Sequence, residues 1–172
     1  ELGVRKIRVT GGEPLIRRGV TDLFAGIGEL PKLETLALTT NASQLADMAP
    51  RLRDAGVNSV NISLDSLQAP RFRLITRTGD LNRVLEGIDA AIAQGIDRIR
   101  LNVVVLDGLN RDEVLPLTQF ALAKNIHISF IEEMPLGQVN VGGKPLAYVS
   151  SDALHAELSE HFCLEPLSAE VT

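Results

Sequence analysis

One stretch of the sequence combines residue types that bind ligands at the end of a strand, Lys6-Ile-Arg-Val-Thr-Gly-Gly-Glu-Pro-Leu15. Its first half alternates basic and β-branched residues, which predicts a buried strand. The two glycines allow positive φ and leave the backbone open to a ligand, because no side chain stands in the way. Pro14 fixes φ and lacks an N–H, which suits the first turn of a helix. The pattern predicts a ligand-binding edge; a plain strand-to-helix turn is the alternative.

Polar residues recur where four later strands are expected to end. Alternating or β-branched runs predict these strands at 35–41, 58–65, 97–106 and 127–134. If the strands are parallel, their carboxyl ends meet at one edge and bring the polar residues together. In chain order these residues are Thr39, Thr40 and Asn41, then Ser63 and Asp65, then Asn102, and then Glu132, Glu133 and Met134.

Helical patterns separate the strands. Asp80 is expected to cap a helix over 81–94, Pro50 to kink or interrupt the helix before it, and Ser151 to cap a helix over 152–162. Asn110 with Glu113 predicts a capping box at the start of another helix. The βα units recur at intervals of about 25–40 residues, and right-handed crossovers between them give a parallel sheet.

The distribution of polar residues favours one α/β architecture. No single Gly-rich phosphate loop marks one dominant switch point, as it would in a doubly wound sheet. Instead every strand ends in polar residues, as in a barrel whose strands all contribute to one mouth. We therefore expect a partial (β/α) TIM-type barrel; a doubly wound sheet is the alternative.

Basic residues occupy alternate positions on the first and fourth predicted strands. Lys6 and Arg8 share one face, as do Arg98 and Arg100. If these faces point into the barrel, the guanidinium groups need anions, because an unpaired buried charge is costly. A phosphorylated or carboxylated ligand would supply them. Ion pairs of Arg8 and Arg100 with protein carboxylates are the alternative, and the candidates are Glu13, Asp65 and Glu132.

Composition narrows the class of protein. The chain has 172 residues, enough for one domain or a piece of a larger protein, and its net charge of −5 argues against a nucleic-acid surface. No apolar run approaches the about 18 residues that span a membrane. A single cysteine and no visible signal peptide predict a cytoplasmic protein without disulfides. The chain begins at Glu1 without Met, and we expect a fragment.

Six segments, in this order and spacing, resemble the GTP 3',8-cyclase family (molybdenum cofactor biosynthesis protein A) of the radical S-adenosylmethionine superfamily. Gly-Gly-Glu-Pro alone is shared by many families of that superfamily, whereas the six segments together are specific to the cyclase. The resemblance covers nearly the whole chain. The segments are 6–15, 38–41, 60–67, 71–77, 101–104 and 130–137.

The resemblance implies a radical S-adenosylmethionine barrel core over 1–136, lacking its N-terminal cluster-binding segment, and the start of a C-terminal region over 137–172. The intact enzyme would be a lyase that converts GTP to (8S)-3',8-cyclo-7,8-dihydroguanosine 5'-triphosphate by a 5'-deoxyadenosyl radical mechanism, in molybdenum cofactor biosynthesis. Its cofactors would be S-adenosylmethionine and two 4Fe-4S clusters. The resemblance also implies that the enzyme could form a homodimer. The enzyme would act before cyclic pyranopterin monophosphate synthase in the pathway, and it would have no nucleic-acid or membrane partner.

The resemblance also implies two sets of binding residues. Residues that would bind S-adenosylmethionine lie after the first, third, fourth and fifth strands: Thr10, Gly12, Glu13, Ser63, Asn102 and Met134. Residues that would bind GTP lie within the strands: Lys6, Arg8, Thr39 and Arg100. No residue of this chain is implied as a catalytic acid or base or as a metal ligand.

The chain departs from the family pattern at several positions. The family usually has Lys where Arg100 stands and Arg where Ser129 stands, which changes two possible anion contacts. The cysteine motifs that hold the clusters are absent, and Cys163 alone cannot hold one, because clusters need about three or four thiolates. We therefore expect the chain by itself to be inactive.

Two other readings remain open at the level of sequence. One is a different radical S-adenosylmethionine enzyme, such as one that modifies a peptide; the other is a non-catalytic α/β binding module. A nucleotide triphosphate is the substrate that would require Arg8, Thr39 and Arg100 together.

Overall fold

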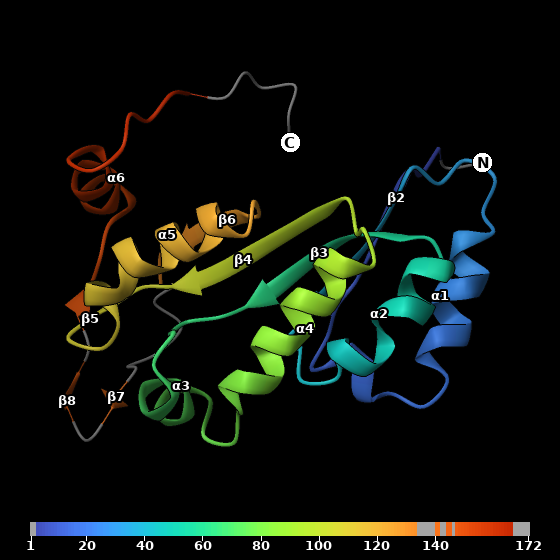
Figure 1. Ribbon diagram of the computed structural model, residues 1–172, viewed down its shortest axis with the longest axis horizontal. Helices are drawn as coiled ribbons and strands as arrows, with labels where there is room; N and C mark the ends of the chain where they lie inside the picture. The colour runs from blue at the N-terminus through green and yellow to red at the C-terminus, as the bar shows by residue number, and fades with distance from the viewer. Residues whose placement is uncertain (1–2, 134–139, 142–143, 146, 167–172) are drawn as a thin grey trace.

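A five-stranded parallel sheet forms the centre of the molecule (Figure 1). The computed structural model describes residues 3–133, 140–141, 144–145 and 147–166. The strands lie in the sheet in the order of the chain, without the reversal of order that defines a doubly wound sheet. The prediction of a partial barrel is therefore confirmed. The strands are β1 (Lys6–Val9), β2 (Thr35–Thr40), β3 (Val57–Ser63), β4 (Arg98–Val104) and β6 (His127–Ile131).

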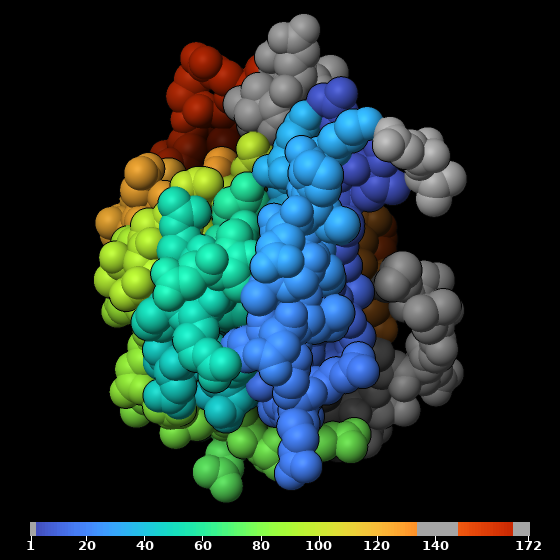
Figure 2. All heavy atoms as spheres, turned by 90° about the vertical axis from the view of Figure 1, so that its right-hand side faces the viewer, coloured from blue at the N-terminus to red at the C-terminus, as the bar shows by residue number. Residues whose placement is uncertain are grey.

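Helices connect the strands, and α1, α2 and α4 lie side by side along one face of the sheet (Figures 1 and 2). Strands added in chain order through right-handed crossovers place their helices on the same face. The α-helices are α1 (Val20–Gly28), α2 (Leu45–Asp54), α3 (Ala69–Thr76), α4 (Leu81–Ala93), α5 (Val114–Ala123) and α6 (Ser151–Ser159). The short elements are η1 (Pro14–Ile16), η2 (Arg111–Glu113), the antiparallel pair β5 (Leu106–Asp107) and β9 (Ala147–Tyr148), and the pair β7 (Asn140–Val141) and β8 (Lys144–Pro145).

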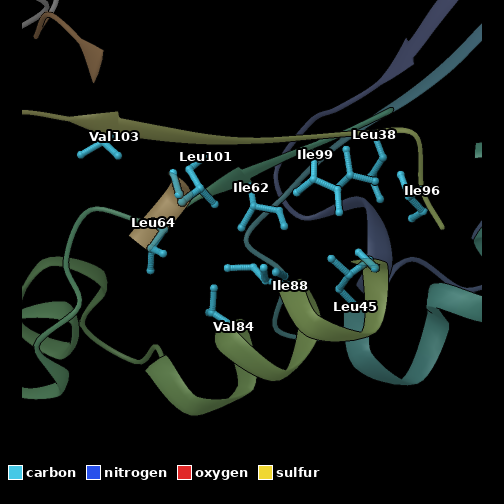
Figure 3. Packing of buried hydrophobic residues seen from close by; sticks show 14 of the residues in the cluster. Leu38, Leu45, Ile62, Leu64, Val84, Ile88, Ile96, Ile99, Leu101 and Val103 are labelled. Atoms are coloured by element: carbon cyan, nitrogen blue, oxygen red, sulfur yellow. The ribbon is translucent and has the colours of Figure 1, made fainter. Parts of the chain in front are cut away.

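The hydrophobic core fills the layer between the sheet and these helices (Figure 3). Leu38, Ile62 and Leu101, on three neighbouring strands, are fully buried, as are Leu45 of α2 and Ile88 of α4. Successive side chains on a strand point to opposite faces, so the residues that alternate with these core residues point to the other face.

One helix interior and two helix starts differ from the sequence predictions. α2 runs unbroken through Pro50, since the buried Ala49 and Leu52 beside it pack into the core and offset the lost hydrogen bond. α6 begins at Ser151 and not after it, because the cap is Ser150, whose hydroxyl accepts the Ala153 N–H at 3.2 Å. Asn110 stands at the N-cap of η2, but its side chain makes no capping hydrogen bond. The Asp80 cap of α4 is confirmed, with its carboxylate accepting the Asn82 N–H.

Candidate functional site

The face of the sheet opposite the helices is polar. The register places Thr39, Asn61 and Arg100 side by side on β2, β3 and β4, and Ser63 beside Asn102 one step nearer the carboxyl edge. Parallel sheets are usually apolar on both faces. A polar second face therefore indicates that a polar ligand or solvent lies against it. We call the following set the polar face: Lys6, Arg8, Thr39, Asn61, Ser63, Arg98, Arg100 and Asn102.

The basic side chains of the polar face have no acidic partner in the part of the chain that the structure describes. Arg8 donates to the Thr39 hydroxyl at 3.4 Å, a long hydrogen bond between two predicted substrate-binding residues. No ion pair of Lys6, Arg8, Arg98 or Arg100 occurs among those residues. These positive charges are therefore available to an anionic ligand.

The three carboxylates considered as partners of Arg8 and Arg100 are engaged elsewhere. The Glu13 carboxylate accepts from groups of its own loop and of β2, and Asp65 accepts the Val104 N–H at 2.8 Å. Glu132 accepts the Ser151 N–H, and this bond, with one from the Tyr148 hydroxyl, lowers the pKa of Glu132. The hydrogen bond to Glu132 raises the pKa of Tyr148. Within the described ranges, the ion-pair alternative for the two arginines is therefore wrong.

The Gly-Gly edge after β1 is open and held in place by Glu13. Gly11 has a φ of 150°, a conformation that side chains rarely adopt. A Cβ placed on Gly12 would meet no described atom within 4 Å, so a ligand can approach the backbone there. The Glu13 carboxylate accepts from the Leu15 N–H at 3.0 Å, the Thr40 hydroxyl at 2.7 Å and the Asn41 N–H at 2.7 Å. Glu13 thus joins the ends of β1 and β2, and its oxygens bind protein donors.

The predicted binding residues fall into three groups. Lys6, Arg8, Thr39, Arg100, Ser63 and Asn102 lie on the polar face, and Thr10, Gly12 and Glu13 follow directly at the carboxyl end of β1. Met134 lies outside the described residues. Ser63 and Asn102 have no side-chain hydrogen bond within the described part of the chain, which leaves both available to a ligand.

Sequence reasoning assigned no role to Asn61 and predicted only a helix cap for Asn110. Asn61 lies between Thr39 and Arg100 on the polar face, and its position two residues before Ser63 is the signal that would have found it. Asn110, only 1 % exposed, donates to the carbonyls of Asp65 and Val104 at 2.8 and 2.9 Å. This contact spans 45 residues of sequence, and no local pattern indicates it.

A buried carboxylate lies behind the same strand ends. Glu113, which is 2 % exposed, accepts from the Ser66 hydroxyl at 2.6 Å, the Leu67 N–H at 2.7 Å and Arg71 at 2.6 Å. Arg71 also forms a forked pair with Asp112, and this hydrogen-bonded pair raises the pKa of Arg71. Sequence reasoning missed this cluster.

Burial raises the pKa of Asp65 above its ordinary value of 3.8, and the Val104 N–H offsets part of that rise. The described residues contain no group of three or more His, Cys, Asp or Glu side chains that could hold a metal, and Cys163 is exposed. A 4Fe-4S cluster therefore does not fit the residues of this chain. Among the described helices, none combines the length and apolarity needed to cross a membrane.

Sequence comparison places the chain among known proteins. It is 53% identical over 163 residues to a GTP 3',8-cyclase from Pseudomonas entomophila and 50% identical over 165 residues to GTP 3',8-cyclase 2 from Pseudomonas aeruginosa. These alignments cover 95% and 96% of this chain but 49% and 50% of the relatives. The chain thus spans about half the length of the curated relatives that it matches, and the resemblance drawn from the six segments is confirmed.

Two solved structures share the fold. TYW1 with a lysine-pyruvate adduct bound superposes with a TM-score of 0.63 at 17% identity, over 91% of this chain and 50% of that one. Coproporphyrinogen III oxidase from Escherichia coli, a radical SAM enzyme, superposes with a TM-score of 0.65 at 15% identity, over 91% and 39%. The model of the radical SAM superfamily matches residues 1–121. With this match, the parallel sheet in chain order and the open Gly-Gly edge, the chain belongs to the radical SAM superfamily.

Proposed function

We propose that the protein to which this chain belongs is a GTP 3',8-cyclase that uses S-adenosylmethionine. The observation that carries the proposal is the positive charge of the polar face, which no carboxylate among the described residues pairs with. GTP is a polyanion that would neutralise this charge. The identity of 53% to a GTP 3',8-cyclase supports the same substrate. A peptide substrate would not require this charge.

The residues at the carboxyl edge fit S-adenosylmethionine. The open backbone at Gly12 would accept the methionine amino group. Ser63 and Asn102, two and three strands away in the sheet, would hold the rest of the cofactor. When bound and cleaved, the cofactor would supply the radical that abstracts hydrogen from the ribose of GTP. The chain itself supplies proximity and orientation between the two ligands.

The residues of the polar face would hold GTP. Arg8 would bind it together with Thr39, to which it already donates, and Arg100 would bind from β4. Lys6, which lies two residues before Arg8 on the same face of β1, would reach the phosphates. The forked guanidinium of Arg100 can bind two oxygens at once, whereas an ammonium acts as a point charge.

Other parts of the proposal concern the whole protein. Both 4Fe-4S clusters would be held by cysteines that this chain does not contain, so the chain alone is expected to be inactive. The boundary at residue 136, a cytoplasmic location, a homodimer and action before cyclic pyranopterin monophosphate synthase remain predictions.

The test is anaerobic turnover by the full-length protein with GTP and S-adenosylmethionine, followed by mass spectrometry of 5'-deoxyadenosine and of the cyclised nucleotide. Arg8→Ala is expected to weaken GTP binding at least about tenfold, because it removes a charge-assisted contact. The matched control is Arg83→Ala on α4, where Arg83 pairs with the exposed Asp47 at 2.6 Å. GTP binding unchanged in Arg8→Ala, or lost equally in both variants, would contradict the proposal.

A further inference from the structure

Two clusters of buried polar side chains join the loop after β3 to the loop after β4. Asn110 lies in the first and Glu113 in the second, and both belong to the segment that enters η2 and α5. We call Asp65, Ser66, Arg71, Asn110 and Glu113 the β3–β4 brace. The predicted binding sets include neither Asn110 nor Glu113, and the sequence pattern predicted only a capping box for this pair.

Asn110 satisfies three backbone groups at the point where β4 leaves the sheet. Its amide donates to the carbonyls of Asp65 and Val104, and its oxygen accepts the Leu106 N–H at 2.9 Å. At the same place Asp65 accepts the Val104 N–H at 2.8 Å, and the Leu64 N–H bonds the Asn102 carbonyl at 3.1 Å. These bonds continue the pairing of β3 with β4 beyond Ser63, where the strand itself ends.

Glu113 holds the next residues of the β3 loop. Its two oxygens accept from the hydroxyl of Ser66 and the backbone of Leu67, so the loop is fixed three and four residues after Ser63. Arg71 at 2.6 Å neutralises the carboxylate, which would otherwise be a buried unpaired charge. A carboxylate is required, because all three of its partners are donors.

The brace therefore fixes the spacing of β3 and β4 close to the polar side chains of Ser63 and Asn102. These two residues are paired in register, and the brace holds the residues two positions after each, Asp65 and Val104. We propose that Asn110 and Glu113 are positioning residues that set Ser63 and Asn102 at the distance required by S-adenosylmethionine. This inference rests on the proposed function, and neither residue touches the cofactor.

The test measures binding to the full-length protein, with S-adenosylmethionine and GTP titrated separately by anaerobic calorimetry. Glu113→Gln keeps the shape of the side chain but replaces an acceptor by a donor, which leaves Leu67 or Arg71 unpaired. We expect the Kd for S-adenosylmethionine to rise about tenfold. The Kd for GTP should stay within about twofold, since the proposed GTP contacts on β1, β2 and the lower part of β4 lie away from the brace.

Two further variants separate positioning from a general loss of structure. Asp112→Asn removes the other, exposed carboxylate that pairs with Arg71 and is the matched control; both Kd values should stay unchanged. Ser66→Ala removes a single hydroxyl from Glu113 and should weaken S-adenosylmethionine binding by a smaller factor in the same direction. Hydrogen exchange at the Leu67 amide reports whether the brace has opened in each variant.

The outcomes are distinct. A wild-type protein that binds neither ligand would overturn the proposed function and this inference with it. A wild-type protein that binds both, with faster exchange at Leu67 in Glu113→Gln but an unchanged Kd for S-adenosylmethionine, would overturn the inference alone. Equal losses for both ligands would also overturn it, whereas a selective loss for S-adenosylmethionine supports it.

Discussion

At the scale of single residues, the carboxylates around the strand ends are used to hold backbone. Glu13 joins β1 to β2 through the Leu15 and Asn41 N–H groups, and Asp65 holds the Val104 N–H. Within the described residues neither carboxylate forms an ion pair with the arginines of the polar face. Each of the two carboxylates therefore fixes the backbone at the strand ends.

Asp65→Asn is expected to stabilise the protein at neutral pH. The folded-state pKa of Asp65 lies above its ordinary value of 3.8, so above pH 3.8 the native state binds more protons than the unfolded state. The free energy of unfolding therefore falls as the pH rises through this range. An asparagine still accepts the Val104 N–H but carries no charge to bury. Urea unfolding should show a gain at pH 7 that shrinks toward pH 4. An equal difference at both pH values would contradict this.

The two adjacent glycines are expected to respond differently to alanine. Gly11→Ala should cost about 1–3 kcal/mol of unfolding free energy, because its φ of 150° is strained for a residue with a Cβ. Gly12→Ala should change stability by less than about 0.5 kcal/mol, since its Cβ meets no described atom within 4 Å. Yet Gly12→Ala should weaken S-adenosylmethionine binding, as measured by calorimetry. Unchanged binding would count against a ligand at this edge.

At the scale of elements, the helices are spaced by their smallest residues. Gly28, at the end of α1, lies so close to the strand-connecting turn after α2 that an added Cβ would stand 2.2 Å from the Ala55 carbonyl oxygen. Gly87 of α4 has similar contacts at 2.9 Å with the Ala42 carbonyl oxygen before α2. These close approaches keep α1 and α4 tightly packed against the segment that contains α2.

Gly28→Ala is expected to lower the free energy of unfolding by about 2 kcal/mol, because the backbone must shift to admit the methyl group. Gly26→Ala on the same helix is the control. Its Cβ would meet no described atom within 4 Å, so the higher helix propensity of alanine should raise stability by up to about 1 kcal/mol. Thermal unfolding of both variants checks the pair. Destabilisation of the same size at Gly26 would show that the contact with Ala55 is unimportant.

At the scale of the whole molecule, the charge distribution opposes the net charge. The chain carries −5 overall, yet Lys6, Arg8, Arg98 and Arg100 share the polar face without an ion pair in the described ranges. The overall charge repels a nucleotide triphosphate, whereas the polar face attracts it. The nearby charges of the polar face should outweigh the more distant charges of the chain, because interactions beyond a Debye length are largely screened.

This gives a prediction about salt. If GTP binds at the polar face, its affinity should fall several-fold from about 0.1 M to about 1 M KCl, as the Debye length falls from about 10 Å to about 3 Å. If the net charge dominated, screening would remove repulsion and affinity would rise. Calorimetric titration of GTP at both concentrations distinguishes the two signs.

Much of the fold was predictable because its signals are local. The alternation in 6–9 and 58–63, the Asp80 cap and the turn at Gly11 each depend on neighbouring residues, and each appears in the structure. The interruption expected at Pro50 was wrong, because packing of α2 outweighs the missing hydrogen bond. The Asn110–Glu113 capping box was wrong because both side chains bind backbone or side chains more than 40 residues away.

The sequence by itself determined the strands, their polar ends and the membership of the radical SAM superfamily, since strand periodicity and motifs are properties of neighbouring residues. The tertiary structure decided which charges remain unpaired, because the partners of Glu13, Asp65 and Glu132 come from distant segments. It also decided the β3–β4 brace, in which a buried carboxylate is stable only where folding assembles three donors around it.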